Sequence, residues 1–170
     1  CLRSPGLFHY YKKGNLLLML TIRPIRPLDR DIFLQMAHEM YHSPAVLHPI
    51  PEEHHVRTFE AFFTMDAYVM GYFLEWNNVC AGYGIVTKGY STEAGGLTLW
   101  VEDVYIRPDF RSKGIGRAFL AFLEQNFPDV FRFRLEVEEN NKRAISLYET
   151  QGFLPLPYIQ MVKEKNSSSN

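Results

Sequence analysis

One segment of the chain carries most of the structural and chemical information: Val101-Glu102-Asp103-Val104-Tyr105-Ile106-Arg107-Pro108-Asp109-Phe110-Arg111-Ser112-Lys113-Gly114-Ile115-Gly116-Arg117. Its first part is apolar except for two acids, which is typical of a strand in the middle of a covered sheet. Its second part is a turn that leads into a glycine-bearing helix start. The segment therefore predicts a buried strand, a turn and a helix in immediate succession.

The turn is suited to binding an anion. Successive backbone N–H groups in such a turn, with the unpaired amides of the first helical turn, point to one spot. Gly114 and Gly116 would let a phosphate approach the backbone without a Cβ clash. The side chains of Arg111, Lys113 and Arg117 add positive charge. The pattern indicates a pyrophosphate site.

Two other glycine motifs are excluded. The Walker motif requires Gly-x-x-x-x-Gly-Lys-Ser/Thr, which the chain lacks. The dinucleotide fingerprint requires a third glycine after Gly114-Ile115-Gly116 and a shorter turn after the strand. We therefore do not expect a P-loop nucleotide site or an NAD site.

The remaining chain predicts a mixed α/β (α+β) arrangement around one sheet. Apolar residues repeat at helical spacing in some segments and alternate in others, and Asn77-Asn78 is a good hairpin turn. The expected strands are 20–26, 68–76, 79–88, 97–106, 133–137 and 153–163, and the expected helices begin near Asp29, Pro51, Gly114 and Asn141.

Length, net charge and cysteine content limit the functions that the chain can have. The 170 residues fit one domain, and a net charge of −1 gives no reason to expect nucleic-acid binding. The two cysteines form no disulfide framework and no metal motif, so we expect a reducing, cytoplasmic setting and no metal. Leu16–Leu20 is too short to span a bilayer, and we expect no membrane association. We assign 1–18 to an N-terminal extension or added residues, 19–165 to the domain and 166–170 to a frayed tail.

Two motifs together resemble the GNAT superfamily of N-acetyltransferases. Arg111, Gly114 and Gly116 fill the three slots of Arg/Gln-x-x-Gly-x-Gly/Ala. Downstream, Asn141-Lys142-Arg143-Ala144-Ile145-Ser146-Leu147-Tyr148 with Gly152-Phe153 is similar to the family's Asn-x-x-Ala-x-x-Leu-Tyr…Gly-Phe segment. The resemblance implies a mixed, mostly antiparallel sheet flanked by helices, with two central strands that splay apart to admit acyl-CoA.

The resemblance also implies residue roles. The strand residues Val104, Tyr105 and Ile106 would pair with the pantetheine arm, and Asn141 would contact the same arm. The turn from Arg111 to Arg117, including Ser112, Lys113 and Ile115, would hold the pyrophosphate. Tyr148 would lie near the sulfur and protonate the leaving thiolate, and Glu102 would act as general base, usually through water. The expected reaction is direct transfer of acetyl from acetyl-CoA to an amine, without an acyl-enzyme.

Several alternatives stay open from the residues alone. Gly114 and Gly116 could merely cap the helix, Asn141 could be only a helix cap, and Tyr148 could be a core residue. Strand alternation predicts that Glu102 and Asp103 point to opposite faces, so one of them could be structural. The protein could instead be a non-catalytic acyl-CoA-binding or sensing module, transfer a different acyl group, or be an interaction module.

The expected acceptor is a small amine, a polyamine or a peptide amine, and the sequence does not choose among them. By the same resemblance, the segment between the first two helices borders the acceptor site. Tyr41, His48 and Glu93 are therefore weak acceptor-site candidates, and acidic neighbours would suit a cationic amine.

Three further expectations concern metal binding, the core and the oligomeric state. The histidines near this segment lack the Glu of HExxH and are not expected to bind metal. Phe59, Phe62 and Phe63 are expected in the core. A homodimer is an open possibility.

Overall fold

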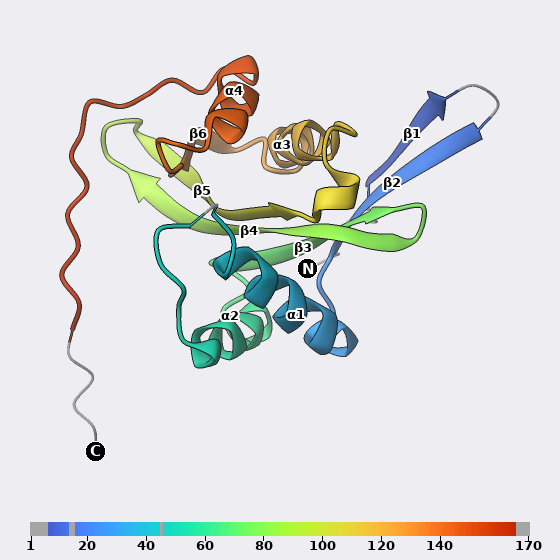
Figure 1. Ribbon diagram of the computed structural model, residues 1–170. Helices are drawn as coiled ribbons and strands as arrows, with labels where there is room; N and C mark the ends of the chain where they lie inside the picture. The colour runs from blue at the N-terminus through green and yellow to red at the C-terminus, as the bar shows by residue number, and fades with distance from the viewer. Residues whose placement is uncertain (1–6, 14–15, 45, 166–170) are drawn as a thin grey trace.

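The computed structural model describes residues 7–13, 16–44 and 46–165, and its sheet has six strands flanked by helices on both faces (Figure 1). The strands are β1 (Leu7–Lys13), β2 (Leu16–Pro24), β3 (Val69–Trp76), β4 (Val79–Ser91), β5 (Gly96–Ile106) and β6 (Val130–Leu135). The α-helices are α1 (Arg30–Tyr41), α2 (Glu52–Thr64), α3 (Ile115–Asn126) and α4 (Lys142–Thr150), with short 3-10 helices at Pro27–Asp29 and Pro108–Phe110.

The sheet follows the order β1-β2-β3-β4-β5-β6, and every neighbouring pair is antiparallel except β5–β6. The parallel pair needs a crossover, which α3 supplies. Helices α1 and α2 pack on one face around Phe33, Phe59 and Tyr83. Helices α3 and α4 cover the other face around Phe119 and Leu123 (Figure 1). The predicted mixed, mostly antiparallel sheet is confirmed.

The hairpin between β3 and β4 forms at the expected residues. Asn77 and Asn78 both have positive φ, at 50° and 63°, as a two-residue turn with the twist of a β-hairpin requires. The predicted core stripe on α2 is also confirmed, since Phe59 and Phe62 are buried and Phe63 packs against the same cluster.

The two ends of the sheet differ from the sequence prediction. Strand β2 begins at Leu16 rather than Leu20, and β1 pairs with it, so the sheet extends into residues 7–13 and 16–18, which we had expected to precede the domain. The strand expected at 153–163 does not form: residues 154–165 are exposed and run as an unpaired segment away from α4 (Figure 1). Two prolines, Pro155 and Pro157, remove ladder donors there. Residues 1–6 and the expected frayed end at 166–170 lie outside the described residues.

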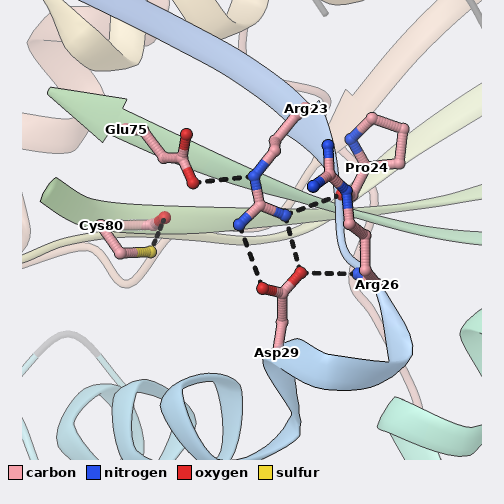
Figure 2. A network of polar contacts seen from close by, with 7 residues as sticks. Arg23, Pro24, Arg26, Asp29, Glu75 and Cys80 are labelled. Carbon is pink, nitrogen blue, oxygen red and sulfur yellow. Dashed lines mark hydrogen bonds and ion pairs between the residues drawn. The ribbon is translucent and has the colours of Figure 1, made fainter. Parts of the chain in front are cut away.

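A partly buried ion cluster fixes the start of α1 against the sheet. Figure 2 shows the Arg23 guanidinium between two carboxylates, with Nε donating to Glu75 at 2.7 Å and the terminal nitrogens donating to Asp29 at 2.7 and 3.0 Å. Asp29 also accepts from the Arg26 backbone N–H, and Arg23 holds the pKa of Asp29 below its usual value despite partial burial. Because β2 and β3 are thereby tied to the helix start, α1 has a fixed position over the sheet.

Strand β5 departs from regular pairing on both of its edges. Its pairing with β6 ends at Val101–Leu135, although β5 continues to Ile106. On the other edge, the register with β4 shifts between Ile85 and Val86, which leaves Glu102 as an extra residue in β5. The first irregularity opens the sheet, and the second is a β-bulge that re-aims side chains. Both occur within the segment that the sequence singled out.

Candidate active site

A cleft of about 680 Å³ opens where β5 continues past the end of its pairing with β6. One wall is the end of β5, the floor is the turn into α3, and the second wall is the start of α4. The end of α1 closes the remaining side. The lining residues are Met40, Ser43, Pro44, Val104, Tyr105, Ile106, Phe110, Arg111, Ser112, Gly114, Ile115, Gly116, Arg117, Glu138, Asn140, Asn141, Arg143, Ala144, Leu147 and Tyr148. Eleven of the twelve predicted cofactor residues are therefore brought together, and Lys113 is the exception.

The turn has the backbone geometry of an anion site. Ser112 and Gly114 have φ of 63° and 79°, so the chain turns twice through the left-handed region and can direct its amides into the cleft. Gly114 is the residue that precedes α3, and no side chain accepts from the amides of the first helical turn. Those amides are thus available to a phosphate.

Gly116 has a packing role that the sequence pattern did not predict. A Cβ at this position would lie 2.9 Å from Leu147 Cδ2 on α4. The glycine therefore allows α3 and α4 to approach each other, and their approach forms the corner of the cleft. Gly116 lies in the first turn of α3 and lines the cleft as well.

Basic side chains surround the turn but differ in how they are held. Arg111 Nε donates to the Ile106 carbonyl at 2.9 Å, and Arg143 donates to Ser112 Oγ at 3.0 Å. Lys113 instead donates to the Asp109 carbonyl and lies over the Phe110 ring, outside the cleft lining. The sequence pattern missed Arg143, although a basic residue in the first turn of the motif-bearing helix is a visible signal.

Among the described residues, the end of β5 has no strand partner on the side of β6, although its Ile106 carbonyl accepts from Arg111. Val104 and Ile106 are half-buried and line the cleft, while their neighbours on the β4 side are paired. Tyr105 alternates to the opposite face, where its hydroxyl donates to Glu39 at 3.1 Å. Glu39 also accepts two hydrogen bonds of 2.9 Å from Arg107, and this pairing lowers its pKa. Helix α1 is thereby tied to the base of the cleft.

Helix α4 supplies the predicted asparagine and tyrosine. Asn141 caps the helix by accepting from the Ala144 N–H at 3.2 Å, so the cap that the sequence left open is present. Tyr148 is half-buried at the cleft wall, with its ring 5.8 Å from that of Phe153. Burial raises the pKa of Tyr148, and the charge of Asp103 raises it further. A phenol with a raised pKa is a neutral proton donor at physiological pH.

The two carboxylates of β5 do not alternate as the strand pattern predicts. Glu102 is exposed and accepts from Thr87 Oγ1 at 2.5 Å. Asp103 is buried and accepts from Tyr41 at 3.1 Å and Tyr83 at 3.3 Å. The charge of Glu102 acts on the pKa of both Tyr41 and Asp103. The bulge therefore brings both acids toward the α1–α2 side, and the expected opposite orientation is wrong.

The three acceptor-site candidates are dispersed. Tyr41 lies at the end of α1 against Asp103, next to the cleft residues Met40 and Ser43. His48 is exposed in the α1–α2 connection. Glu93 lies near the turn between β4 and β5, where it pairs with Arg132 and accepts from Tyr158 at 2.9 Å. The structure joins only Tyr41 to the carboxylates of β5.

His38 of α1 and His42, which follows α1, form a surface cluster with Glu52 of α2. His38 contacts Glu52, and the rings of His38 and His42 stack at 3.9 Å. His55 is buried against Tyr41, and burial lowers its pKa. Within the described ranges, no group of three or more His, Cys, Asp or Glu side chains could hold a metal ion. In the same ranges, no helix has the length and apolarity to cross a bilayer.

Known proteins share part of the sequence. Thialysine N-epsilon-acetyltransferase of Sus scrofa is 37% identical over 73 residues, which cover 42% of this chain and 42% of that enzyme. The Caenorhabditis elegans protein of the same name is 40% identical over 78 residues, covering 45% and 48%. These matches span less than half of the curated relatives.

Solved structures share the fold over most of the chain. The aminoglycoside N-acetyltransferase AAC(6')-Iy, in complex with the bisubstrate analog CoA-S-monomethyl-acetylneamine, gives a TM-score of 0.71 at 12% identity, covering 86% of this chain and 98% of that one. A possible acetyltransferase from Clostridium difficile 630 gives 0.73 at 18% identity, covering 86% and 97%. The sequence model of the acetyltransferase (GNAT) family matches residues 34–153. The chain belongs to the acetyltransferase (GNAT) family.

Proposed function

We propose that the protein transfers an acetyl group from acetyl-CoA directly to an amine. The observation that carries this proposal is one cleft that joins an amide-rich, basic turn to a neutral tyrosine along a free strand edge. Family members use acetyl-CoA, and the residues here fit that donor. The turn amides suit its pyrophosphate, Arg111 and Arg143 suit its charge, and the edge at Val104 and Ile106 suits its amide-bearing arm.

The proposed step is balanced by groups that the chain supplies. The amine nitrogen attacks the thioester carbonyl, a C–N bond forms, and the C–S bond breaks. The amine proton leaves to a base or to water, and Tyr148 donates its proton to the departing thiolate. A backbone N–H on the free edge of β5 can donate to the oxyanion. Holding both reactants in one cleft contributes by proximity.

Glu102 remains our proposal for the base. Its exposure and its position in the bulge allow it to act on an amine through water. An ammonium group with a pKa near that of lysine must lose a proton before it can attack. The exposed carboxylate can accept that proton and release it to solvent, which a fully enclosed group could not do as readily.

We propose a cationic amine as the acceptor. Glu102 and Asp103 place two carboxylates on the α1–α2 side of the cleft, and Tyr41 lies with them. Two negative groups favour a positively charged substrate by electrostatic steering. The relatives named for thialysine and aminoglycoside acetylation act on amines, which is consistent with this class.

The test is a thiol-release assay with acetyl-CoA and a panel of amines: a polyamine, free lysine, an aminoglycoside and a peptide N-terminus. We expect release above the no-amine rate with at least one cationic amine, and mass spectrometry of the product should show one added acetyl group. Longer acyl-CoA donors in parallel test the alternative of a different acyl group. Donor binding without any release would support a sensing module instead.

We further propose that two copies associate in a reducing, cytoplasmic setting. The segment 154–165 exposes Leu154, Ile159 and Met161, which are 83%, 91% and 94% accessible. Apolar side chains exposed in a row favour association, and β6 has an edge without a partner among the described strands. Light scattering should give the mass of a dimer, and deleting 154–165 should yield a monomer.

A further inference from the structure

Asp103 lies outside the cleft lining, but it directly precedes Val104, which lines the cleft, and its side chain is buried. Its side chain is 7% exposed and lies between three elements. Tyr41 of α1 donates to Oδ1 at 3.1 Å, and Tyr83 of β4 donates to Oδ2 at 3.3 Å. Among the described side chains Asp103 has no ion-pair partner within 4.0 Å. It is a carboxylate held by two phenols.

The charged and titratable groups around Asp103 come from every neighbouring element. Glu102 of β5 acts on it directly, and Tyr148 of α4 is affected by its charge. Behind Tyr41 lies His55 of α2, with ring centroids 5.1 Å apart, and Tyr105 lies 5.9 Å from Tyr83. Since none of these contacts is a cation fixed on the carboxylate, ionised Asp103 keeps its negative charge beside Tyr41.

The Tyr83 hydroxyl has two possible hydrogen-bond acceptors, and the ionisation of Asp103 decides between them. Its hydroxyl lies 3.2 Å from Met40 Sδ and 3.3 Å from Asp103 Oδ2. An ionised carboxylate is a much stronger acceptor than a thioether. When Asp103 is ionised, both phenols are therefore directed at it, and the end of α1 is fixed to β5 immediately after the bulge.

We propose that Asp103 is a positioning residue of the acceptor half of the site. Its carboxylate fixes the Tyr41 hydroxyl beside the cleft and attracts a cationic amine to that side. This role rests on the proposed acetyl transfer. It differs from the role of Glu102, which accepts a proton from the amine.

The proposed role of Asp103 predicts how kcat/KM for the amine changes with pH. Burial raises the pKa of Asp103 to about 6, while the bonds from Tyr41 and Tyr83 act to lower it. Only the neutral amine reacts, so log kcat/KM for the amine rises with a slope of 1 below the amine pKa. Below about pH 6 Asp103 is protonated as well, so two protons must be lost to reach the reactive state, and the slope of log kcat/KM against pH becomes 2.

The experiment compares kcat/KM for the amine between pH 5 and pH 8 in the wild type, Asp103→Asn and Tyr83→Phe. We expect Asp103→Asn to lower kcat/KM at pH 8 at least tenfold, to keep the affinity for acetyl-CoA, and to show a slope of 1 throughout. In Tyr83→Phe the break should move to higher pH, because a donor that lowers the Asp103 pKa is lost while Tyr41 remains.

The controls separate this role from a structural one and from the proposed function. Tyr90→Phe, which changes an exposed tyrosine of the same strand, should leave the break in place. A break that persists in Asp103→Asn, or that does not move in Tyr83→Phe, would assign it to another group, such as a histidine, and overturn the role. Should Asp103→Asn fail to fold, Tyr83→Phe alone decides the question. Absence of turnover by the wild type would instead overturn the proposed function.

Discussion

The two halves of the cleft are built from different materials. The half that we propose for the cofactor is largely backbone: a turn with two left-handed residues, the first amides of α3 and the edge of β5 beyond its pairing with β6. The half that we propose for the acceptor consists of side chains from α1, β4 and β5 that meet across long sequence separations, as Tyr41 and Asp103 do. A backbone site demands glycines at fixed spacing and leaves a local motif, whereas a side-chain site leaves none.

The largest effect should follow from Gly116→Glu in the backbone half. The new side chain would meet Leu147 at the α3–α4 contact and add a negative charge to the phosphate turn. We expect acetyl-CoA affinity to fall by at least 100-fold in calorimetric titration. Circular dichroism and thermal unfolding should show a folded protein.

Gly89→Glu is the matched control for this substitution. Gly89 also lies in a regular element, but a Cβ there would meet no described atom within 4 Å. The Gly89→Glu variant should bind acetyl-CoA as the wild type does. If Gly116→Glu, shown to be folded, bound the donor with normal affinity, the phosphate turn would be misassigned.

Tyr148→Phe should separate chemistry from binding at the boundary between the halves. Removing the proton donor should lower kcat by roughly 10²-fold while leaving the acetyl-CoA affinity unchanged. Stopped assays at saturating donor and amine measure this directly. Tyr90→Phe, at an exposed position, should keep full turnover, and equal turnover in both variants would remove Tyr148 as the acid.

Glu39→Gln should weaken the contact that joins α1 to the end of β5. Glu39 accepts from Arg107 and Tyr105, and its lowered pKa means that the pairing stabilises the fold above the usual carboxyl pKa and is lost as pH falls. We expect a loss of about 1 kcal/mol in unfolding free energy at pH 7. The difference should shrink below pH ~4 in urea titrations, whereas Glu60→Gln on the exposed face of α2 should change little at either pH.

The smallest effect is expected from Glu52→Gln. The contact between Glu52 and His38 joins α1 to α2, but both side chains are exposed, at 62% and 52%. Exposed pairs contribute little to stability because water screens them. Urea unfolding at pH 6 should not distinguish this variant from the wild type, and a clear loss of stability would show that the surface histidines hold the acceptor half together.

Elements that depend on local turn and cap residues were predictable from the sequence, whereas features that depend on strand pairing were not. The hairpin at Asn77-Asn78, helix α3 after Gly114 and helix α4 after Asn141 follow from turn and cap residues, and the structure has all three. The bulge at Glu102 could not be foreseen, because it arises from pairing with β4 rather than from local preference. The strand expected at 153–163 does not form, because a strand also needs a neighbouring strand to pair with, and the described residues bring none alongside this segment.

The central claim is that the turn from Arg111 to Arg117 and the free edge of β5 bind acetyl-CoA. Calorimetric titration of the purified chain with acetyl-CoA, with free CoA and NAD as comparisons, tests it most directly. The account predicts saturable binding of acetyl-CoA with one site per chain and no binding of NAD. A folded sample that binds neither acetyl-CoA nor free CoA would contradict it.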